Sequence, residues 1–217
     1  MGTGNQQNDK QAKAEYLLYG NHINLEPLDF RHAEGLNSAA DSDISPYLWS
    51  PVPLGKDAVN KYIQTALDWR EAGTAVPFAI IRVKDGAIIG STRIFNIERW
   101  AWPSDNPRHG HPFPDGCEIG YSWLTSSAIR TGANTEAKLL LLKMAFEKWH
   151  VFRVCLHTDV RNIRSRNAIE RIGGKFEGIL RSHRLAVDNI PRDSARFSIL
   201  ASEWPDVKLR LEKLLDR

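Results

Sequence analysis

The segment Ser-Ser-Ala-Ile-Arg-Thr-Gly-Ala-Asn-Thr-Glu-Ala-Lys, residues 126–138, lies between two regular hydrophobic patterns. Before it, residues 117–124 are rich in β-branched and aromatic side chains, which is typical of a strand. After it, apolar residues recur at the spacing of an amphipathic helix: Ala137, Leu140, Leu141, Met144 and Ala145. The sequence therefore predicts a strand, a short loop with one glycine, and a helix that begins within the segment.

The predicted helix start is suited to binding a phosphate, because the first turn of a helix carries unpaired N–H donors and a partial positive charge. Either Thr131 or Asn134 is able to cap the helix. Arg130 lies beside the loop, and Gly132 permits close approach of the backbone. We therefore expect a pyrophosphate site that is formed by Arg130, Thr131, Gly132, Ala133, Asn134 and Thr135.

The size and charge of the chain narrow the class of protein. It has 217 residues, enough for a sizeable core, and a formal net charge of +3. So small a charge, without a concentrated basic stripe, does not predict nucleic-acid binding. No run reaches the roughly 18 apolar residues of a membrane span, and no signal segment opens the chain. We expect a cytoplasmic protein, monomeric or homodimeric, with no nucleic-acid or membrane partner.

The termini and cysteines suggest how the domain is organised. Residues 1–18 are largely polar and without periodicity, so we expect a disordered tail followed by a single domain over residues 19–217. Cys117 and Cys155 each lie in an apolar, strand-like segment. This placement favours two core residues in a reducing compartment rather than a disulfide framework.

Elsewhere, strand patterns outnumber helical ones, and Asp85-Gly86 is a hairpin turn signal. Helices are expected over residues 29–39, from 57, over 162–172 and from 203; strands are expected over 21–28, 76–83, 87–97, 153–158, 176–180, 182–187 and 193–200. This order predicts an α+β fold in which helices are inserted into a mostly antiparallel sheet.

Two loops are rich in aromatic residues and proline. Residues 45–53 form either a lid over the core or one wall of a substrate pocket. Residues 100–114 form a loop of a length that is usually functional or disordered. His109 and His111 in this loop lack a third ligand at a recognisable spacing, so we predict no metal site.

Several motifs, taken in order, resemble the GNAT N-acetyltransferase superfamily. They are Glu118-Ile119-Gly120-Tyr121, the glycine-containing loop, Thr135-Glu136-Ala137, Asn162-x-x-Ser165, and Ile172-Gly173 followed by Phe176-Glu177-Gly178. The chain is most similar to the branch of ribosomal-protein N-terminal acetyltransferases and their small-molecule relatives, which the segment Ser198–Leu200 with Glu203-Trp204 also fits. The resemblance covers roughly residues 21–203.

The resemblance implies a mixed, mostly antiparallel sheet of about 6–7 strands flanked by helices, with two central strands splayed apart. Acetyl-CoA would bind as co-substrate between the strand that ends at Trp123 and Leu124 and the strand over residues 154–158. The phosphate loop departs from the family pattern Gln/Arg-x-x-Gly-x-Gly/Ala, since the charged residue is displaced to Arg130. Because backbone N–H groups make most phosphate contacts, we expect the site to persist.

The resemblance also implies roles for individual side chains. Acetyl transfer to an amine needs a neutral nucleophile, a stabilised oxyanion and a protonated thiolate. Glu118 would be the base, or alternatively a salt-bridge partner on the sheet. Tyr121 would donate a proton to the thiolate, or simply pack; Ser165 would meet the sulfur. Asn162 would bind the pantetheine arm, or only cap its helix. Arg166, like Arg164, would reach the phosphates, or remain a solvated surface charge.

The predicted activity is acetyl-CoA-dependent N-acetyl transfer to the primary amine of a small molecule, such as an amino acid, polyamine, amino sugar or antibiotic, by direct attack in a ternary complex. Trp49, Trp100 and Trp102 indicate a closed aromatic wall around such a substrate. The alternatives are acetylation of a peptide or protein N-terminus, and a non-catalytic acyl-CoA-binding module. An unrelated nucleotide-binding fold is disfavoured, since neither Gly-x-Gly-x-x-Gly nor a Walker loop is present.

Overall fold

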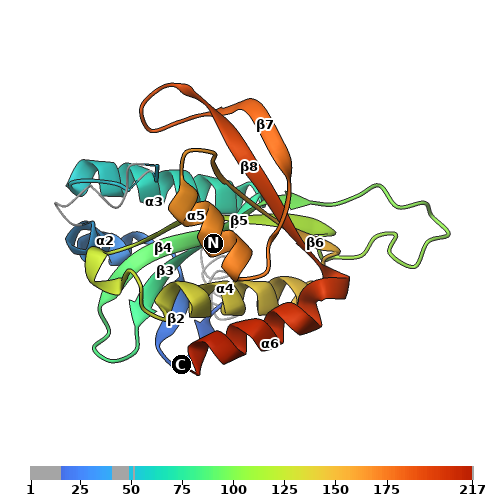
Figure 1. Ribbon diagram of the computed structural model, residues 1–217, viewed down its shortest axis with the longest axis horizontal. Coiled ribbons are helices and arrows are strands. Elements are labelled where there is room, and N and C mark those ends of the chain that lie inside the picture. Colours follow the sequence, from blue (N-terminus) through green and yellow to red (C-terminus); the bar gives the residue numbers. More distant parts are fainter. Residues whose placement is uncertain (1–15, 41–48, 51, 217) are drawn as a thin grey trace, which may run out of the picture.

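Eight strands form one sheet in the order β1-β2-β3-β4-β5-β6-β8-β7 (Figure 1). The computed structural model describes residues 16–40, 49–50 and 52–216. The strands are β1 (Leu18–Tyr19), β2 (Ile23–Pro27), β3 (Ala75–Arg82), β4 (Ile88–Glu98), β5 (Gly116–Leu124), β6 (Arg153–Asp159), β7 (Lys175–Leu185) and β8 (Pro191–Leu200). All neighbouring pairs are antiparallel except β5 and β6.

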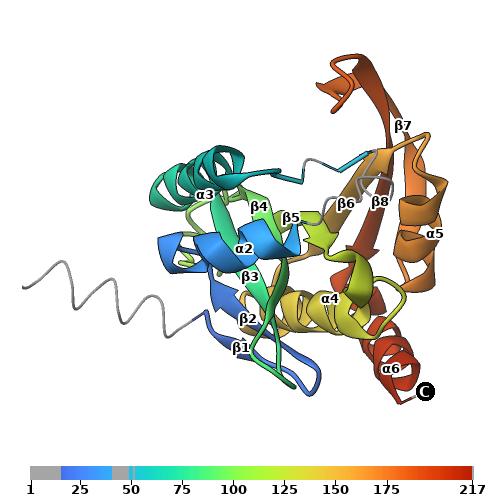
Figure 2. The ribbon, with the colours of Figure 1, turned by 90° about the vertical axis from the view of Figure 1, so that its left-hand side faces the viewer.

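Helices cover both faces of this sheet (Figure 2). They are α2 (Ala33–Ala39), α3 (Lys56–Glu71), α4 (Ala133–Lys143), α5 (Ile163–Arg171) and α6 (Trp204–Leu215). One apolar cluster joins α2 and α3 to one face through residues such as Leu36, Ile63 and Ala79. A larger cluster packs α4, α5 and α6 against the other face. Among the described residues, no helix is both long and apolar enough to cross a membrane.

The predicted α+β fold and mostly antiparallel sheet are confirmed, with two corrections. The sheet has eight strands rather than 6–7, because the short β1 adds an edge strand in which Leu18 pairs with Leu25. Leu18 therefore belongs to the fold and not to the predicted tail; residues 1–15 lie outside the described residues. Most of the predicted loop over residues 45–53 also lies outside them.

The parallel strands β5 and β6 separate soon after they meet. Their register contains three pairs, from Gly116 with Arg153 to Glu118 with Cys155. Beyond Glu118, β5 continues to pair with β4 on its other side as far as Leu124. The remainder of β5 therefore has one edge that is not hydrogen-bonded to β6, and the predicted splaying of two central strands is present.

A bulge bends β5 where the strands diverge. The β4–β5 register shifts between Ser91 and Arg93, opposite Trp123 and Gly120, and Tyr121 between them has a φ of 50°. Such a bulge bends a strand and redirects its side chains. Gly90, on β4 opposite the end of β5, has a φ of 155°. A Cβ there would collide with the carbonyl oxygen of Trp123, so glycine lets β4 lie close to the end of β5.

A buried carboxylate ties α4 to the β1–β2 turn. Glu136 is 3% exposed. Its carboxylate accepts hydrogen bonds from the backbone N–H groups of Asn21, His22 and Ile23, at 2.7, 2.8 and 2.8 Å. Three donors compensate the desolvation of one buried charge. This contact fixes the first turn of α4 against the sheet.

We predict that Glu136→Gln lowers the free energy of unfolding by about 2 kcal/mol or more, because the amide brings N–H groups to a site that contains only donors. Urea denaturation measures this change. The matched control is Glu212→Gln, which removes an exposed ion pair with Lys143 at 3.3 Å and should cost less than about 1 kcal/mol. Equal losses in the two variants would contradict the role of Glu136.

Candidate active site

A cleft opens between the diverging strands and has two adjoining parts. One part, of about 360 Å³, includes Glu118 and His157, and we call it the Glu118 end. The other, of about 390 Å³, includes Arg130, Arg164 and Arg171, and we call it the arginine end. Residues that line both parts make the cleft continuous: Ser50, Ser122, Trp123, Asn134, Asn162, Ser165 and Ala168.

The arginine end contains the start of α4. The first helical hydrogen bond runs from Glu136 N to Gly132 O at 2.9 Å. The Thr131 hydroxyl donates to Ala128 O at 2.7 Å and lies 3.2 Å from Ala133 N, whose hydrogen bond it accepts. The N-cap residue is Gly132, which has no side chain to cap the helix, so neither Thr131 nor Asn134 is the predicted cap. Thr131 instead binds the N–H of Ala133 from the preceding loop, and Asn134 lines the cleft. Within the described part of the chain, the N–H groups of Asn134 and Thr135 make no hydrogen bond.

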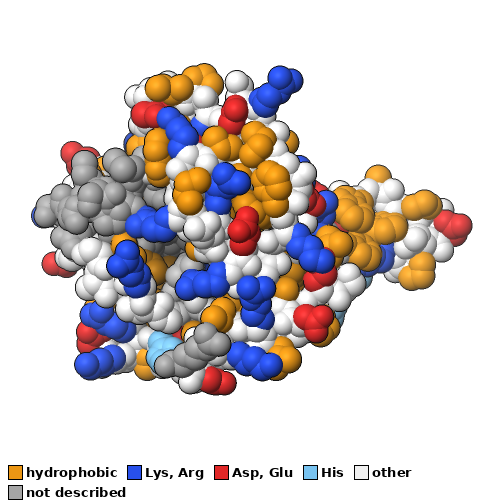
Figure 3. Space-filling view, viewed as in Figure 1, with side chains coloured by type: hydrophobic (Ala, Val, Ile, Leu, Met, Phe, Trp, Pro, Cys, Tyr) orange, Lys and Arg blue, Asp and Glu red, His pale blue; other side chains and the backbone are white. Residues whose placement is uncertain are grey.

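Three arginines line the same end: Arg130, Arg164 and Arg171. Basic side chains gather on the face that carries α4 and α5 (Figure 3). Arg166, in contrast, does not line the cleft, since its Nη1 lies 3.5 Å from Val160 O and its guanidinium faces the ring of Phe176. Arg171, on the last turn of α5, lies where Arg166 was predicted to act.

Gly132 is required for packing rather than for access to the cleft. Its φ is −64°, whereas the residue with a left-handed φ in this loop is Arg130, at 64°. A Cβ at Gly132 would lie 3.3 Å from Leu215 and 3.7 Å from His22. The small residue therefore lets α4 approach α6 and the β1–β2 turn, which differs from the role predicted for it.

Glu118 is held by three side chains at the opposite end of the cleft. Asn96 Nδ2 donates to its Oε2 at 2.8 Å, and Arg184 Nη2 donates to the same oxygen at 3.1 Å. His157 Nδ1 lies 2.9 Å from Oε1. Burial alone would raise the pKa of Glu118, but His157, Arg184 and Asn96 together lower it below its ordinary value. Glu118 is therefore ionised at neutral pH.

His157 has a ring nitrogen available for chemistry. Its side chain is 6% exposed and lines the Glu118 end. Nε2 is buried and makes no hydrogen bond to any residue that the structure describes. The ring of His183 lies 5.2 Å away, and burial, with Arg184 and His157, lowers the pKa of His183. A buried nitrogen without a partner points to a missing ligand.

The remaining predicted catalytic residues lie along the cleft. Asn162 Oδ1 accepts a hydrogen bond from Ser165 N at 3.0 Å, so Asn162 does cap α5. Asn162 and Ser165 also line both parts of the cleft. Tyr121 lines the Glu118 end, and its ring packs against Phe95, Trp69 and the buried Arg93. Trp123 lines both ends of the cleft, and Leu124 the arginine end.

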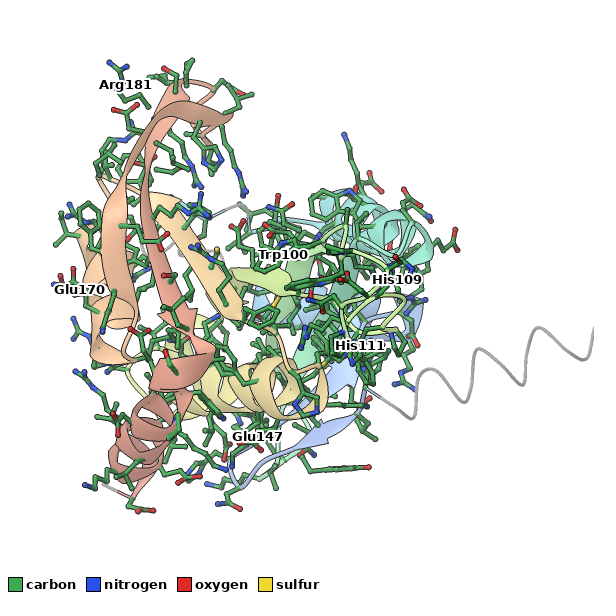
Figure 4. All side chains as sticks on the ribbon, turned by 90° about the vertical axis from the view of Figure 1, so that its right-hand side faces the viewer. Trp100, His109, His111, Glu147, Glu170 and Arg181 are labelled. Atoms are coloured by element: carbon green, nitrogen blue, oxygen red, sulfur yellow. The ribbon has the colours of Figure 1, made fainter. Side chains whose placement is uncertain are left out.

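The three tryptophans predicted to form a wall do not come together. Trp49 lines the Glu118 end, under the guanidinium of Arg161. Trp100 and Trp102 lie in the loop of residues 99–115, which projects from the sheet, and pack on Phe152 (Figures 1 and 4). Asp115 accepts hydrogen bonds from both residues. His109 bonds to Trp102 O and His111 to Phe113 N.

Sequence reasoning missed four charged or titratable groups of the Glu118 end: Lys138, His157, Arg184 and Arg192. Two of them carried a usable signal. His157 lies on the strand that was predicted to flank the splayed strand of Glu118. Lys138 is four residues from Asn134 and so shares its helix face. Arg184 and Arg192 carried none, because only the β7–β8 pairing brings them to the cleft.

The cleft fits an extended molecule with an anionic end. The helix start and three arginines suit phosphates, and the free edge of β5 offers N–H and C=O groups to a linear chain. Ionised Glu118 with His157 suits proton transfer at the other end. A mostly antiparallel sheet opened in this way, with these groups at the two ends, defines an acetyltransferase fold. The chain belongs to the acetyltransferase (GNAT) domain family, which matches residues 22–175.

Individual relatives agree with this family. The chain is 36% identical over 91 residues to "Putative ribosomal N-acetyltransferase YdaF" of Bacillus subtilis; the match covers 42% of this chain and 49%, about half, of that relative. A crystal structure of a GCN5-related N-acetyltransferase from Brucella melitensis is 26% identical, with a TM-score of 0.77 over 92% of this chain and 85% of the other. A "putative acetyltransferase from T. thermophilus" is 32% identical, with a TM-score of 0.73 over 92% of this chain and 96% of the other.

We predict that Arg184→Met raises the pKa of Glu118, because the desolvation that opposes its charge then loses one compensating partner. Carbon-detected NMR titration of the Glu118 carboxyl group measures the change. A lowered pKa contributes stability above the ordinary value of 4.5 that is lost as the pH falls. The variant should therefore lose stability at neutral pH and depend less on pH in the acid range.

The control for this titration is Arg181→Met, on the same strand but with an exposed side chain (Figure 4). It should leave the titration of Glu118 unchanged. The same midpoint in wild type and in Arg184→Met would contradict the electrostatic role of Arg184.

Proposed function

We propose that this protein is an acetyl-CoA-dependent N-acetyltransferase. The observation that carries the proposal is one continuous cleft with a phosphate-suited helix start at one end and the Glu118–His157 pair at the other. Neither end alone indicates this activity. Their connection along the free edge of β5 is what an acyl-thioester donor and an amine acceptor require.

The arginine end would hold the phosphates of the coenzyme. The N–H groups of Asn134 and Thr135 and the side chains of Arg130, Arg164 and Arg171 supply donors and positive charge. Asn162, Trp123 and Leu124 lie along the path of the pantetheine arm. When bound, the coenzyme supplies an acetyl group activated as a thioester.

The Glu118 end would prepare the acceptor amine. An ionised carboxylate attracts an ammonium group, and Glu118 orients the ring of His157 through the contact at Nδ1. His157 Nε2, buried and unpartnered, is the candidate to take the proton that the amine loses, with Glu118 stabilising the resulting charge. Glu118 thus acts as base through His157 or directly. Tyr121 and Ser165 remain predictions as further catalytic residues.

A peptide N-terminus is the acceptor that we place first. The small-molecule hypothesis rested on three tryptophans, and two of them lie in the projecting loop. The relative from Bacillus subtilis is named a ribosomal N-acetyltransferase. A small amine remains the second candidate, favoured by the volume of about 360 Å³ at the Glu118 end, which suits a small ligand.

Arg192 adds a selective feature to the acceptor site. It lines the Glu118 end, and its Nε donates to Ser194 Oγ at 3.2 Å. It forms no ion pair among the described residues, and burial lowers its pKa. An acceptor with a carboxylate near its amine would pair with Arg192, so peptides with an acidic second residue and amino acids belong in the first screen.

Calorimetric titration with acetyl-CoA tests the proposal, with NAD and ATP as controls. Micromolar binding of acetyl-CoA alone, followed by thiol release with an amine or peptide, supports the function. Absence of acetyl-CoA binding contradicts it. Binding without thiol release across both acceptor classes would favour a non-catalytic acyl-CoA-binding module.

We predict that Arg171→Ala weakens acetyl-CoA binding about tenfold, equivalent to about 1.4 kcal/mol, by removing one phosphate partner. Calorimetry at fixed ionic strength measures the change. Arg166→Ala is the control on the same helix, because Arg166 faces Val160 and Phe176 outside the cleft. An equal loss in both variants would contradict the assignment of the arginine end.

We also predict that Glu118→Gln and His157→Asn each lower kcat by about 100-fold or more, with little change in acetyl-CoA affinity. The reason is that both residues lie at the acceptor end of the cleft. Thiol release under saturating donor and acceptor measures kcat. His111→Asn, in the projecting loop, is the control; a His157→Asn variant with wild-type kcat would refute the role of His157.

A further inference from the structure

Lys138 is a buried cation at the Glu118 end of the cleft. It lies on α4 and is 6% exposed. Its Nζ donates to Ser122 Oγ at 2.5 Å, and Ser122 Oγ lies 2.7 Å from Thr92 Oγ1. Several neighbouring residues on α4 are apolar and buried: Ala137, Leu141 and Leu142.

Lys138 has no carboxylate partner within the described residues. Its hydrogen-bond partner in the described part of the chain is the neutral Ser122 hydroxyl, although an ammonium group has three protons to donate. Burial lowers the pKa of Lys138 to about 7. A buried charge without a counter-ion destabilises a fold. The arrangement is therefore expected to serve a bound group that is negative or becomes negative.

The position of Lys138 in the cleft indicates which part of a bound acetyl-CoA would lie beside it. Asn134 lines both ends of the cleft, whereas Lys138, one turn further along α4, lines the Glu118 end only. The phosphate-suited arginines lie at the other end. In an acetyl-CoA complex, the group beside Glu118 would be the thioester, and its sulfur becomes negative when the acetyl group leaves.

We propose that Lys138 stabilises and protonates the departing thiolate of coenzyme A. This inference rests on the proposed function, and it assigns to Lys138 the proton donation that was predicted for Tyr121. The Ser122–Thr92 pair holds Nζ in place. The ring of Tyr121 packs instead on Arg93, Trp69 and Phe95.

The step balances in atoms and charge. The amine nitrogen forms a bond to the carbonyl carbon, and the carbon–sulfur bond breaks with its electron pair on sulfur. The proton from Lys138 Nζ moves to sulfur, which leaves a neutral lysine and a thiol. The proton that nitrogen loses passes to the Glu118–His157 pair. After the products leave, this pair releases its proton to solvent water, and solvent water returns one proton to Lys138.

Other titratable groups face the same end, and each comes from a different strand: Glu118 on β5, His157 on β6, Arg184 on β7 and Arg192 on β8, with Tyr121 beside Glu118. None of them is a cause of the lowered pKa of Lys138, which burial alone accounts for. Substituting Lys138 therefore removes its own titration and leaves the titration of these other groups in place.

The test is the ultraviolet absorbance of the thiolate in the binary complex with saturating coenzyme A, recorded across pH for wild type and Lys138→Met. We expect a thiolate fraction near pH 7 that is at least about tenfold higher in wild type. Lys143→Met, on the exposed side of the same helix, should match wild type. In addition, NMR of the Lys138 side chain should show its pKa rising when coenzyme A binds.

Several outcomes separate this inference from the proposed function. If coenzyme A binds wild type but the thiolate fraction is the same in Lys138→Met, or the pKa of Lys138 does not move on binding, the role of Lys138 is overturned and the function stands. If coenzyme A does not bind wild type, both are overturned. Without coenzyme, Lys138→Met should raise Tm, because it removes a buried unpaired cation; a lower Tm together with an unchanged thiolate fraction would indicate a purely structural lysine.

Discussion

The separation of β5 from β6 after three residue pairs is the constraint on which the site depends. A parallel pair that continued to Leu124 would satisfy the β5 backbone and close the cleft. The bulge at Tyr121 bends β5 away from β6, while β4 stays hydrogen-bonded to the other edge of β5. Because α4 follows β5 directly and α5 follows β6, the same divergence places the starts of both helices at the mouth of the cleft. One irregularity in the sheet thus positions the backbone edge, the helix start and the Asn162 cap together.

The buried polar side chains fall into two groups: those with hydrogen-bond or ion-pair partners within the protein, and those without. Glu136 accepts three backbone hydrogen bonds and strengthens the contact between α4 and the sheet. Glu118 likewise has hydrogen-bond or ion-pair partners at both carboxylate oxygens. His157 Nε2 has no hydrogen-bond partner among the described residues, and the ammonium of Lys138 has no carboxylate partner there; both groups lie in the cleft. Buried polar groups that lack partners lower stability, and proteins retain them chiefly where a ligand completes the set. The buried groups without partners thus lie in the same cleft that the proposed function assigns to the substrates.

Features set by local chain chemistry could be predicted from the sequence. The strand, loop and helix around residues 126–138 and the Asn162 cap depend on neighbouring residues only. Features set by packing between distant segments could not. The reason for Gly132 lies in Leu215 of α6, and Arg171 rather than Arg166 faces the cleft because of how α5 is rotated. Trp100 and Trp102 were predicted to line a pocket because their loop is rich in aromatic residues. Instead, Trp100 stacks on Phe152 and Trp102 donates a hydrogen bond to Asp115, within the projecting loop.

The β7–β8 hairpin has a consequence for how this protein could diversify. The hairpin contributes Arg184, Leu185, Ala186, Val187 and Arg192 to the Glu118 end, and none of its residues lines the arginine end. It is a contiguous piece of chain at the edge of the sheet, beyond β6. Under the proposed function, exchanging its tip would alter which amine is admitted, while the proposed donor site on β5, α4 and α5 stays intact. Acceptor choice and donor binding would then be encoded in separable segments, an arrangement in which new specificities can arise by changing one hairpin.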